Sequence, residues 1–140
     1  MTMTLTPNQI STIGFVIAAI IAVCGFMKLL RSDRVLFFLF PITLIIAVIG
    51  LIIRSDNTRM VNGNAADMLL SPFIYVASYT LLRYVYKRIY KVEPTYERYN
   101  WFDYEDGRKQ NWLDVLVHLI PLMLCMTLPF LIENLLNKYA

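Results

Sequence analysis

Four almost unbroken apolar runs, each about 20 residues long, constrain this chain more than any other feature. They cover Ile10–Leu30, Val35–Ile53, Ala65–Tyr86 and Trp112–Ile132. A helix of about 20 apolar residues crosses the hydrocarbon core of a bilayer. Because backbone amides find no water there, each run is predicted to be an α-helix. The sequence therefore predicts an all-α, polytopic membrane protein, in which residues 1–140 form a single domain of four transmembrane helices in a small bundle.

The low charge content agrees with this prediction. Only 16% of the residues are Asp, Glu, Lys or Arg, against roughly 25% in a typical soluble domain. The segment before the first run contains no basic residue, and the run is longer than the apolar part of a signal peptide. We therefore expect the first run to remain as a span, although Cys24 loosely resembles a lipoprotein cleavage site. Cys24 and Cys125 belong to no metal or redox motif and are expected to stay unbridged.

The distribution of Lys and Arg predicts the orientation of the helices. Cationic side chains in short loops resist translocation and stay in the cytoplasm. Ten of the 13 Lys and Arg residues lie at the first or the third connection between the runs. We therefore expect these connections, including the loop 87–111, in the cytoplasm and both termini outside (N-out, C-out). The expected location is the plasma (inner) membrane, crossed several times.

Basic and aromatic side chains alternate where the third run ends. This basic collar consists of Arg83, Lys87, Arg88 and Lys91, interleaved with Tyr84, Tyr86 and Tyr90. Tyr favours the membrane interface, and each nearby cation gains about 1 kcal/mol from anionic lipid. The collar is therefore predicted to contact anionic headgroups of the bilayer. Beyond the collar the charge turns slightly negative, which argues against a nucleic-acid partner.

Two runs open with the same pattern, an Asn followed three residues later by an Asp. Asn64 and Asp67 precede the third run, and Asn111 and Asp114 begin the fourth. An N-cap Asn accepts from a free backbone amide, and an acidic residue in the first turn favours the positive end of the helix dipole. Both aspartates near the membrane therefore have a structural explanation as helix starts.

Small residues recur at every fourth position in the first run, and the second run carries a comparable stripe. The stripes consist of Gly14, Ala18 and Ala22 in the first run and of Thr43, Ala47 and Gly50 in the second. Such stripes let transmembrane helices approach closely. We interpret them as the contact between the first two helices, with a homo-oligomer contact as the alternative.

One group of polar residues lies inside the predicted spans. Asp114 and His118 share one face of the fourth helix. In an antiparallel arrangement, Arg83 of the third helix lies near the depth of Asp114, and Tyr79 lies near that of His118. Ionisable residues inside spans are functional candidates by default. The simpler interpretation is an interhelical hydrogen-bond lock, and the alternative is a proton-sensitive or ligand-binding cluster open to the cytoplasm. One His and one Asp are too few to indicate a metal.

The loop between the third and fourth runs is rich in aromatic residues. The candidates for docking are Tyr96, Tyr99, Trp101, Phe102 and Tyr104. Disordered segments are poor in aromatics, which argues against a freely solvated linker. The loop is predicted either to rest in the headgroup layer as an interfacial hairpin or to dock another protein, because Tyr and Trp dominate interface hot spots.

These features indicate a non-enzymatic membrane protein that acts through protein–protein interaction. It would be an accessory subunit of a membrane complex or an immunity protein against a membrane-active toxin. The alternative is a small homo-oligomeric transporter or channel that uses the polar residues of the third and fourth helices. No nucleophile–base pair is evident, so no catalytic residue is assigned and no cofactor is expected.

Overall fold

The computed structural model describes residues 5–61, 63–97, 102–103 and 107–139, without side-chain detail at 102–103, 133 and 136–139. Its long helices are α1 (Pro7–Phe26), α2 (Asp33–Ile53), α3 (Ser71–Tyr90) and α4 (Trp112–Tyr139). Its short 3-10 helices are η1 (Leu29–Arg31), η2 (Asp56–Thr58) and η3 (Ala65–Leu70). Four short strands complete the described structure: β1 (Arg59–Met60), β2 (Gly63–Asn64), β3 (Phe102–Asp103) and β4 (Arg108–Lys109). They form two antiparallel hairpins, β1–β2 and β3–β4, in which Arg59 pairs with Asn64 and Phe102 with Lys109.

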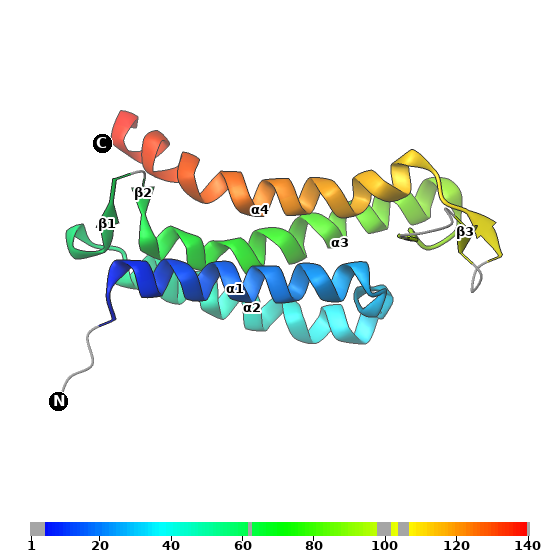
Figure 1. The fold of residues 1–140 in the computed structure, drawn as a ribbon, viewed down its shortest axis with the longest axis horizontal. Helices are drawn as coiled ribbons and strands as arrows, with labels where there is room; N and C mark the ends of the chain where they lie inside the picture. Colours follow the sequence, from blue (N-terminus) through cyan, green and yellow to red (C-terminus); the bar gives the residue numbers. More distant parts are fainter. Residues whose placement is uncertain (1–4, 62, 98–101, 104–106, 140) are drawn as a thin grey trace.

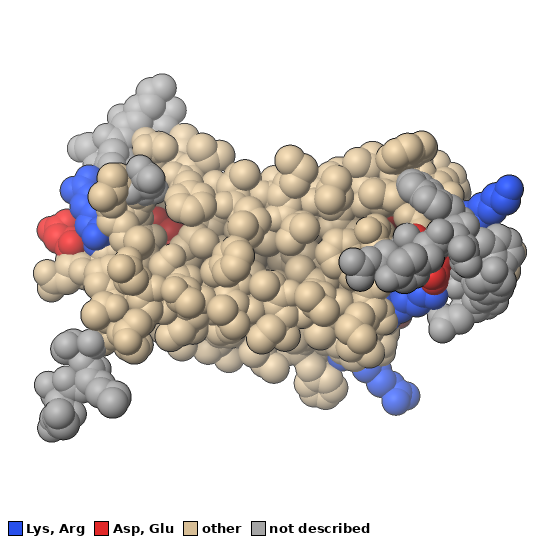
Figure 2. Space-filling view, viewed as in Figure 1, with Lys and Arg blue, Asp and Glu red and all other residues tan. Residues whose placement is uncertain are grey.

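The four long helices run side by side along the length of the molecule (Figure 1). Each is long and apolar enough to cross a membrane, so the predicted all-α, multi-pass membrane fold is confirmed. Both termini and the β1–β2 hairpin lie at one end of the bundle, which we call the terminal end. The connection 27–32 and the described residues between α3 and α4 (91–97, 102–103 and 107–111) lie at the other, the loop end. On the face shown in Figure 2, the charged side chains lie toward these two ends, with a wide uncharged belt between them.

Two of the spans begin at residues whose side chains cap the first free backbone N–H groups. Thr6 and Gln9 form a capping box at the start of α1, where each side chain bonds the backbone N–H of the other residue. Asn64 caps the third span as predicted, because its side chain accepts from the N–H of Ala66 at 3.0 Å. That span opens as η3 and becomes α-helical only at Ser71. Both cysteines are free, as expected.

The third span, formed by η3 and α3, is the central element of the bundle. More than half (56%) of its most apolar stretch is buried, compared with 33% or less in the other three spans. Its buried residues include polar ones at every fourth position, namely Asp67, Ser71, Tyr75, Tyr79 and Arg83. The span is thus the least apolar of the four and also the most enclosed by protein. This agrees with the rule that polar groups in spans face the bundle interior.

Gly14 of α1 and Gly50 of α2 lie against the third span, which corrects the predicted contact between the first two helices at these two positions. A Cβ on Gly14 would overlap the backbone of Met68, and a Cβ on Gly50 would lie 2.8 Å from the carbonyl oxygen of Ala66. Direct contact between α1 and α2 is minor. The same face of α1 also buries Ala18 and Ala22. Because Gly14 and Gly50 carry no side chain, α1 and α2 can each lie directly against the backbone of η3.

Candidate functional site

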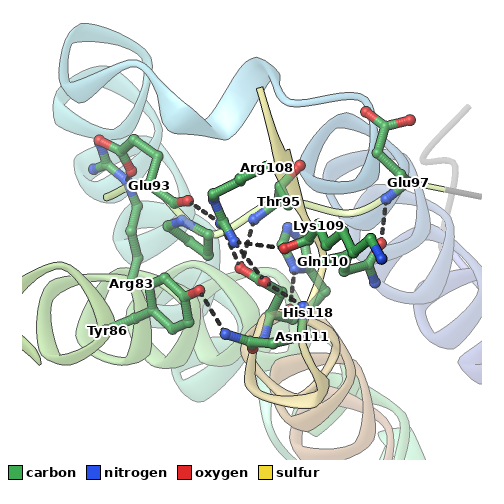
Figure 3. A network of polar contacts seen from close by, with 12 residues as sticks. Arg83, Tyr86, Glu93, Thr95, Glu97, Arg108, Lys109, Gln110, Asn111 and His118 are labelled. Atoms are coloured by element: carbon green, nitrogen blue, oxygen red, sulfur yellow. Dashed lines mark hydrogen bonds and ion pairs between the residues drawn. The ribbon is translucent and has the colours of Figure 1, made fainter. Parts of the chain in front are cut away.

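The connection between α3 and α4 folds back over the loop end of the bundle. Residues 93–97 leave α3 and residues 107–111 return to α4; we call these two segments the neck (Figure 3). Lys91 ends α3 in the left-handed conformation and turns the chain. Pro94 and Thr95 are then fully buried. The neck is therefore packed into the bundle and differs from an ordinary surface loop.

Asp114, in the first turn of α4, is the centre of the neck. Its fully buried carboxylate accepts hydrogen bonds from the backbone N–H groups of Thr95 (3.0 Å) and Asn111 (2.8 Å). Arg108 binds both carboxylate oxygens, at 2.9 and 2.7 Å. The Asn111 side chain accepts in return from the Asp114 N–H at 2.9 Å, so the predicted cap is confirmed. One carboxylate thus ties the outgoing and the returning segments of the neck to α4.

Arg83 of α3 likewise binds the neck through charged hydrogen bonds. Its Nε and Nη2 each donate to a carboxylate oxygen of Glu93 at 2.8 Å. Nη1 donates to Asp33 and Nη2 to the carbonyl of Arg31, both at 2.5 Å. Arg83 was predicted near the depth of Asp114, but it pairs with these carboxylates, and Asp114 is neutralised by the arginine of the neck. Arg83 therefore joins α3 to the neck and to the start of α2.

His118 lies one turn below Asp114 and is enclosed by rings. Its Nδ1 lies 2.8 Å from the Asp114 carbonyl oxygen. Its ring centroid lies 5.5 Å from that of Tyr79, as the predicted juxtaposition requires, and 5.7 and 5.8 Å from those of Phe26 and Tyr96. Only 2% of His118 is exposed. The cluster was predicted to be open to the cytoplasm if functional, but the neck covers it. The hydrogen bond of His118 lies within α4 and the Tyr79 hydroxyl finds no partner among the described residues, so the interhelical lock stays a prediction.

The neck charges outside the spans are held in their ionised forms. Burial alone would raise the pKa of Glu93, but hydrogen bonds from Arg83 and from Lys87 outweigh it and hold that pKa below its usual 4.5. The hydrogen-bonded Asp114 carboxylate raises the pKa of Arg108 above its ordinary value. The guanidinium of Arg108 also lies 5.9 Å above the Tyr86 ring. The neck is therefore a set of mutually compensated charges near neutral pH.

The aromatic candidates fall into two groups. Tyr96 belongs to the neck and packs edge-on against Phe26, with ring centroids 4.8 Å apart. It is half-buried and part of the bundle. The backbone of Phe102 belongs to β3, and its side chain lies outside the described structure. The remaining candidates, which also lie outside the described residues, are Tyr99, Trp101 and Tyr104.

Sequence reasoning did not identify the neck residues that pair with the predicted cluster. Glu93, Thr95 and Arg108 lie in the aromatic-rich loop, for which no internal pairing was predicted. Pro94 was the available signal, because a proline after a helix end constrains the turn that follows. The pairings themselves join residues 6 to 50 positions apart along the chain. Local sequence patterns contain no information on such contacts.

Inside the bundle, α3 buries hydroxyl groups that bond nothing nearby. The hydroxyls of Ser71, Tyr75 and Tyr79 find no hydrogen-bond partner among the residues that the structure describes. The rings of Tyr75 and Tyr79 are stacked, with centroids 6.2 Å apart. An unpaired buried hydroxyl costs about 1–3 kcal/mol. This stripe is therefore the second candidate for a functional feature.

Neither feature has the composition of a metal centre. Within the part of the chain that the structure describes, no three His, Cys, Asp or Glu side chains are grouped closely enough to hold an ion. In comparisons with known proteins, the chain matches no family model, no curated protein and no solved structure. A functional assignment for this four-helix membrane protein therefore depends on the geometry of the neck and of the hydroxyl stripe.

Proposed function

We propose that this chain is a non-enzymatic membrane protein that presents the loop residues 98–106 to another membrane protein. The observation that carries the proposal is the convergence of both neck segments on one buried carboxylate. Thr95 precedes the loop residues, and Arg108 and Asn111 follow them, and all three donate to Asp114. The ends of the displayed segment are therefore fixed to the start of α4.

Such fixation is unnecessary for a segment that only connects two helices. A flexible linker needs no buried ion pairs, and breaking a buried pair by removing one partner costs about 3–5 kcal/mol. Fixed ends increase the affinity of a binding loop, because a segment that is already held in place loses less conformational entropy on association. The arrangement of rigid base and displayed loop is common among binding proteins.

The sequence of the displayed segment supports a docking role. Residues 98–106 contain Tyr99, Trp101, Phe102 and Tyr104, together with Arg98. Tyr, Trp and Arg are the residue types most enriched at interface hot spots. Orientation by the positive-inside rule places this segment in the cytoplasm. The proposed partner is accordingly a membrane protein with a surface on the cytoplasmic side.

A light-activated crosslinking residue at position 101 tests the proposal. We expect a discrete protein adduct whose yield falls about 30-fold with Tyr99→Ala, the equivalent of a hot spot of about 2 kcal/mol. The same crosslinker at Trp112, the only other Trp and 74% exposed at the same end, is the matched control. Adducts to lipid alone at position 101, or a protein adduct insensitive to Tyr99→Ala, would leave the loop as an interfacial hairpin.

The identity of the crosslinked protein distinguishes the two forms of the proposal. A constitutive adduct to a resident membrane protein supports an accessory subunit. An adduct that forms only after cells meet a pore-forming toxin supports an immunity protein. Adducts only between copies of this chain would favour a homo-oligomer and contradict both.

The buried hydroxyls of α3 favour a second candidate, a small transporter or channel that moves protons. Ser71, Tyr75 and Tyr79 follow one another at single-turn intervals between Asp67 and Arg83, and all are buried. Intramembrane polar residues in such a row can form a relay. This support comes from the interior of one chain, so it requires no particular number of subunits.

Proton flux into liposomes containing the purified protein tests the second candidate. A pH-sensitive dye inside the vesicles should report uptake driven by a potassium diffusion potential. Tyr75→Phe and Tyr79→Phe should each reduce the flux, whereas Tyr84→Phe on the exposed face of α3 should not. Flux no greater than in protein-free vesicles would reject a proton path and leave the hydroxyls as buried packing groups.

A further inference from the structure

A large groove opens between α2 and α3 in the half of the bundle near the loop end. Its volume is about 1070 Å³. Aromatic and apolar residues of α2 form one wall, and the basic collar of α3 forms the other at the loop end. Among the described residues, none of the neck or of the hydroxyl stripe lines the groove, although Arg83, which binds Glu93 of the neck, does. The groove is therefore distinct from the features assigned above.

The groove follows from the uneven packing of α2. Near the terminal end, Thr43, Ala47 and Gly50 are buried, and a Cβ on Gly50 would lie 2.9 Å from the Cβ of Leu69. In the first ten residues of α2, only Leu36 is buried. Small residues hold one half of α2 against the third span, and bulky ones keep the other half away.

The charges along the groove are not balanced. Arg83 pairs with Asp33 and Glu93, and Lys87 also pairs with Glu93. Arg88 donates to the hydroxyl of Tyr84 at 3.1 Å. Within the described part of the chain, no carboxylate pairs with Arg88 or with Lys91. The groove thus carries an excess of positive charge at the level where the apolar belt ends.

The opposite wall is apolar. Phe37 is 75% exposed and Phe40 is 39% exposed, and Pro41 continues the wall toward the membrane centre. The N-terminus of α2 lies at the cationic end, and its N-cap Ser32 makes no side-chain cap bond. The first turn of α2 also carries Asp33, whose carboxylate lines the groove and pairs with Arg83. The groove therefore changes from cationic to apolar along the direction of the bilayer normal.

We propose that this groove binds one anionic phospholipid, with its phosphate at Arg88 and Lys91 and one acyl chain along Phe37 and Phe40. The polarity of the groove matches that of a lipid in both sign and direction. A transmembrane helix is a poor occupant, because close helix packing needs small residues and these walls are bulky. The inference does not depend on the partner of the loop.

Lipid retention measured by native mass spectrometry tests this assignment. The wild-type chain is purified in mild detergent with equal amounts of synthetic phosphatidylglycerol and phosphatidylcholine. We expect one phosphatidylglycerol per chain to be retained in preference to phosphatidylcholine. Arg88→Gln and Lys91→Gln should each weaken retention about fivefold, as expected for a cation near anionic lipid. Circular dichroism confirms that each variant remains helical.

Matched controls separate a groove from a general charge effect. Lys109→Gln removes an exposed cation at the same end but outside the groove, and should leave retention unchanged. Phe37→Ala should weaken retention, whereas Phe38→Ala, 66% exposed and not part of the groove, should not. Equal loss in Lys109→Gln and Arg88→Gln would overturn the site.

A soluble headgroup decides whether the acyl chain contributes. Glycerol phosphate carries the same phosphate without the hydrocarbon. We expect a hundredfold molar excess of it over phosphatidylglycerol to leave the lipid bound. Complete displacement by that excess would show a phosphate site without a lipid groove. Equal retention of the two phospholipids would likewise contradict the proposal, because the cationic end would then be without effect.

Discussion

The two ends of the bundle are held together by different interactions. At the loop end, Arg83, Arg108 and Asp114 join three helices and the neck through charged hydrogen bonds. At the terminal end, Gly14 and Gly50 bring two helices into contact with the backbone of η3. Charged bonds depend on pH and on the presence of both partners, whereas close packing depends on volume. The loop end is therefore held mainly by charged hydrogen bonds, and the terminal end by close backbone packing together with one ion pair, Arg54–Asp67 at 3.2 Å.

This difference agrees with the roles proposed for the two ends. Directional bonds fix the angle at which a segment leaves the bundle, so they suit an end that displays a loop. Backbone packing fixes the distance between helices but presents no side chain outward. Substitutions that remove contacts at each end in turn test which interactions stabilise the loop end and which stabilise the terminal end.

The largest effect is expected from Asp114→Ala. The change removes the carboxylate that neutralises Arg108 and accepts from the N–H of Thr95, and should cost about 3–5 kcal/mol. The free energy of unfolding, measured by titration with a denaturing detergent in mixed micelles, checks this. Asp33→Ala is the control, because Asp33 also pairs with an arginine but its side chain is 81% exposed; we expect about 1 kcal/mol or less. Similar losses in both variants would contradict the central role of Asp114.

Gly14→Val should have the next largest effect, at the terminal end. The added side chain meets the backbone of Met68, which cannot rotate away as a side chain could. Overpacking of this kind costs about 1–3 kcal/mol. Ile13→Val, at a 43% exposed neighbouring position, should change stability by about 0.5 kcal/mol or less. The loss from Gly14→Val should be the same at pH 7 and pH 4; a pH-dependent loss would show that the ends are not independent.

Acidification should weaken the loop end. Glu93 has a folded-state pKa below its usual 4.5, so its stabilising contribution is complete above that value and is lost as pH falls through the lower folded-state pKa. Because this carboxylate is partly exposed, the loss is about 1 kcal/mol. Thermal unfolding followed by circular dichroism between pH 7 and pH 3 measures it. The stability of Glu93→Gln should depend less on pH over the same range. If its pH dependence equals that of the wild type, groups other than Glu93 cause the loss of stability.

The smallest effect is expected from His118→Phe. Phenylalanine keeps a ring among Phe26, Tyr79 and Tyr96 but loses the bond to the Asp114 carbonyl. This bond lies within α4, and a single intramolecular hydrogen bond contributes about 0.5–1.5 kcal/mol. Because the ring packing is kept, we expect a loss at the lower end of that range, with the loop crosslink unchanged. Loss of crosslinking or of proton flux at normal stability would instead give His118 a direct functional role.

The sequence by itself determined where the helices lie and how several of them begin. Hydrophobic runs and caps are local properties, since a span needs only its own side chains to be apolar and a cap needs only the next three residues. Asn64 and Asn111 could therefore be identified as caps from their neighbours along the chain. The proximity of Tyr79 and His118 could also be predicted. In two antiparallel helices the rise per residue gives the depth of each side chain in the membrane, and these two side chains lie at similar depths.

The tertiary structure alone decided which residues those helices contact. The stripe that contains Gly14 could face any neighbouring helix. That Gly14 contacts η3 depends on the packing of the whole bundle. Likewise, Asp114 could accept from any arginine at the membrane surface. It binds Arg108 because the neck folds back over the bundle, and Arg83 is already held by Glu93 and Asp33. Partner choice among chemically equivalent groups depends on the positions of distant segments, which the local sequence does not contain.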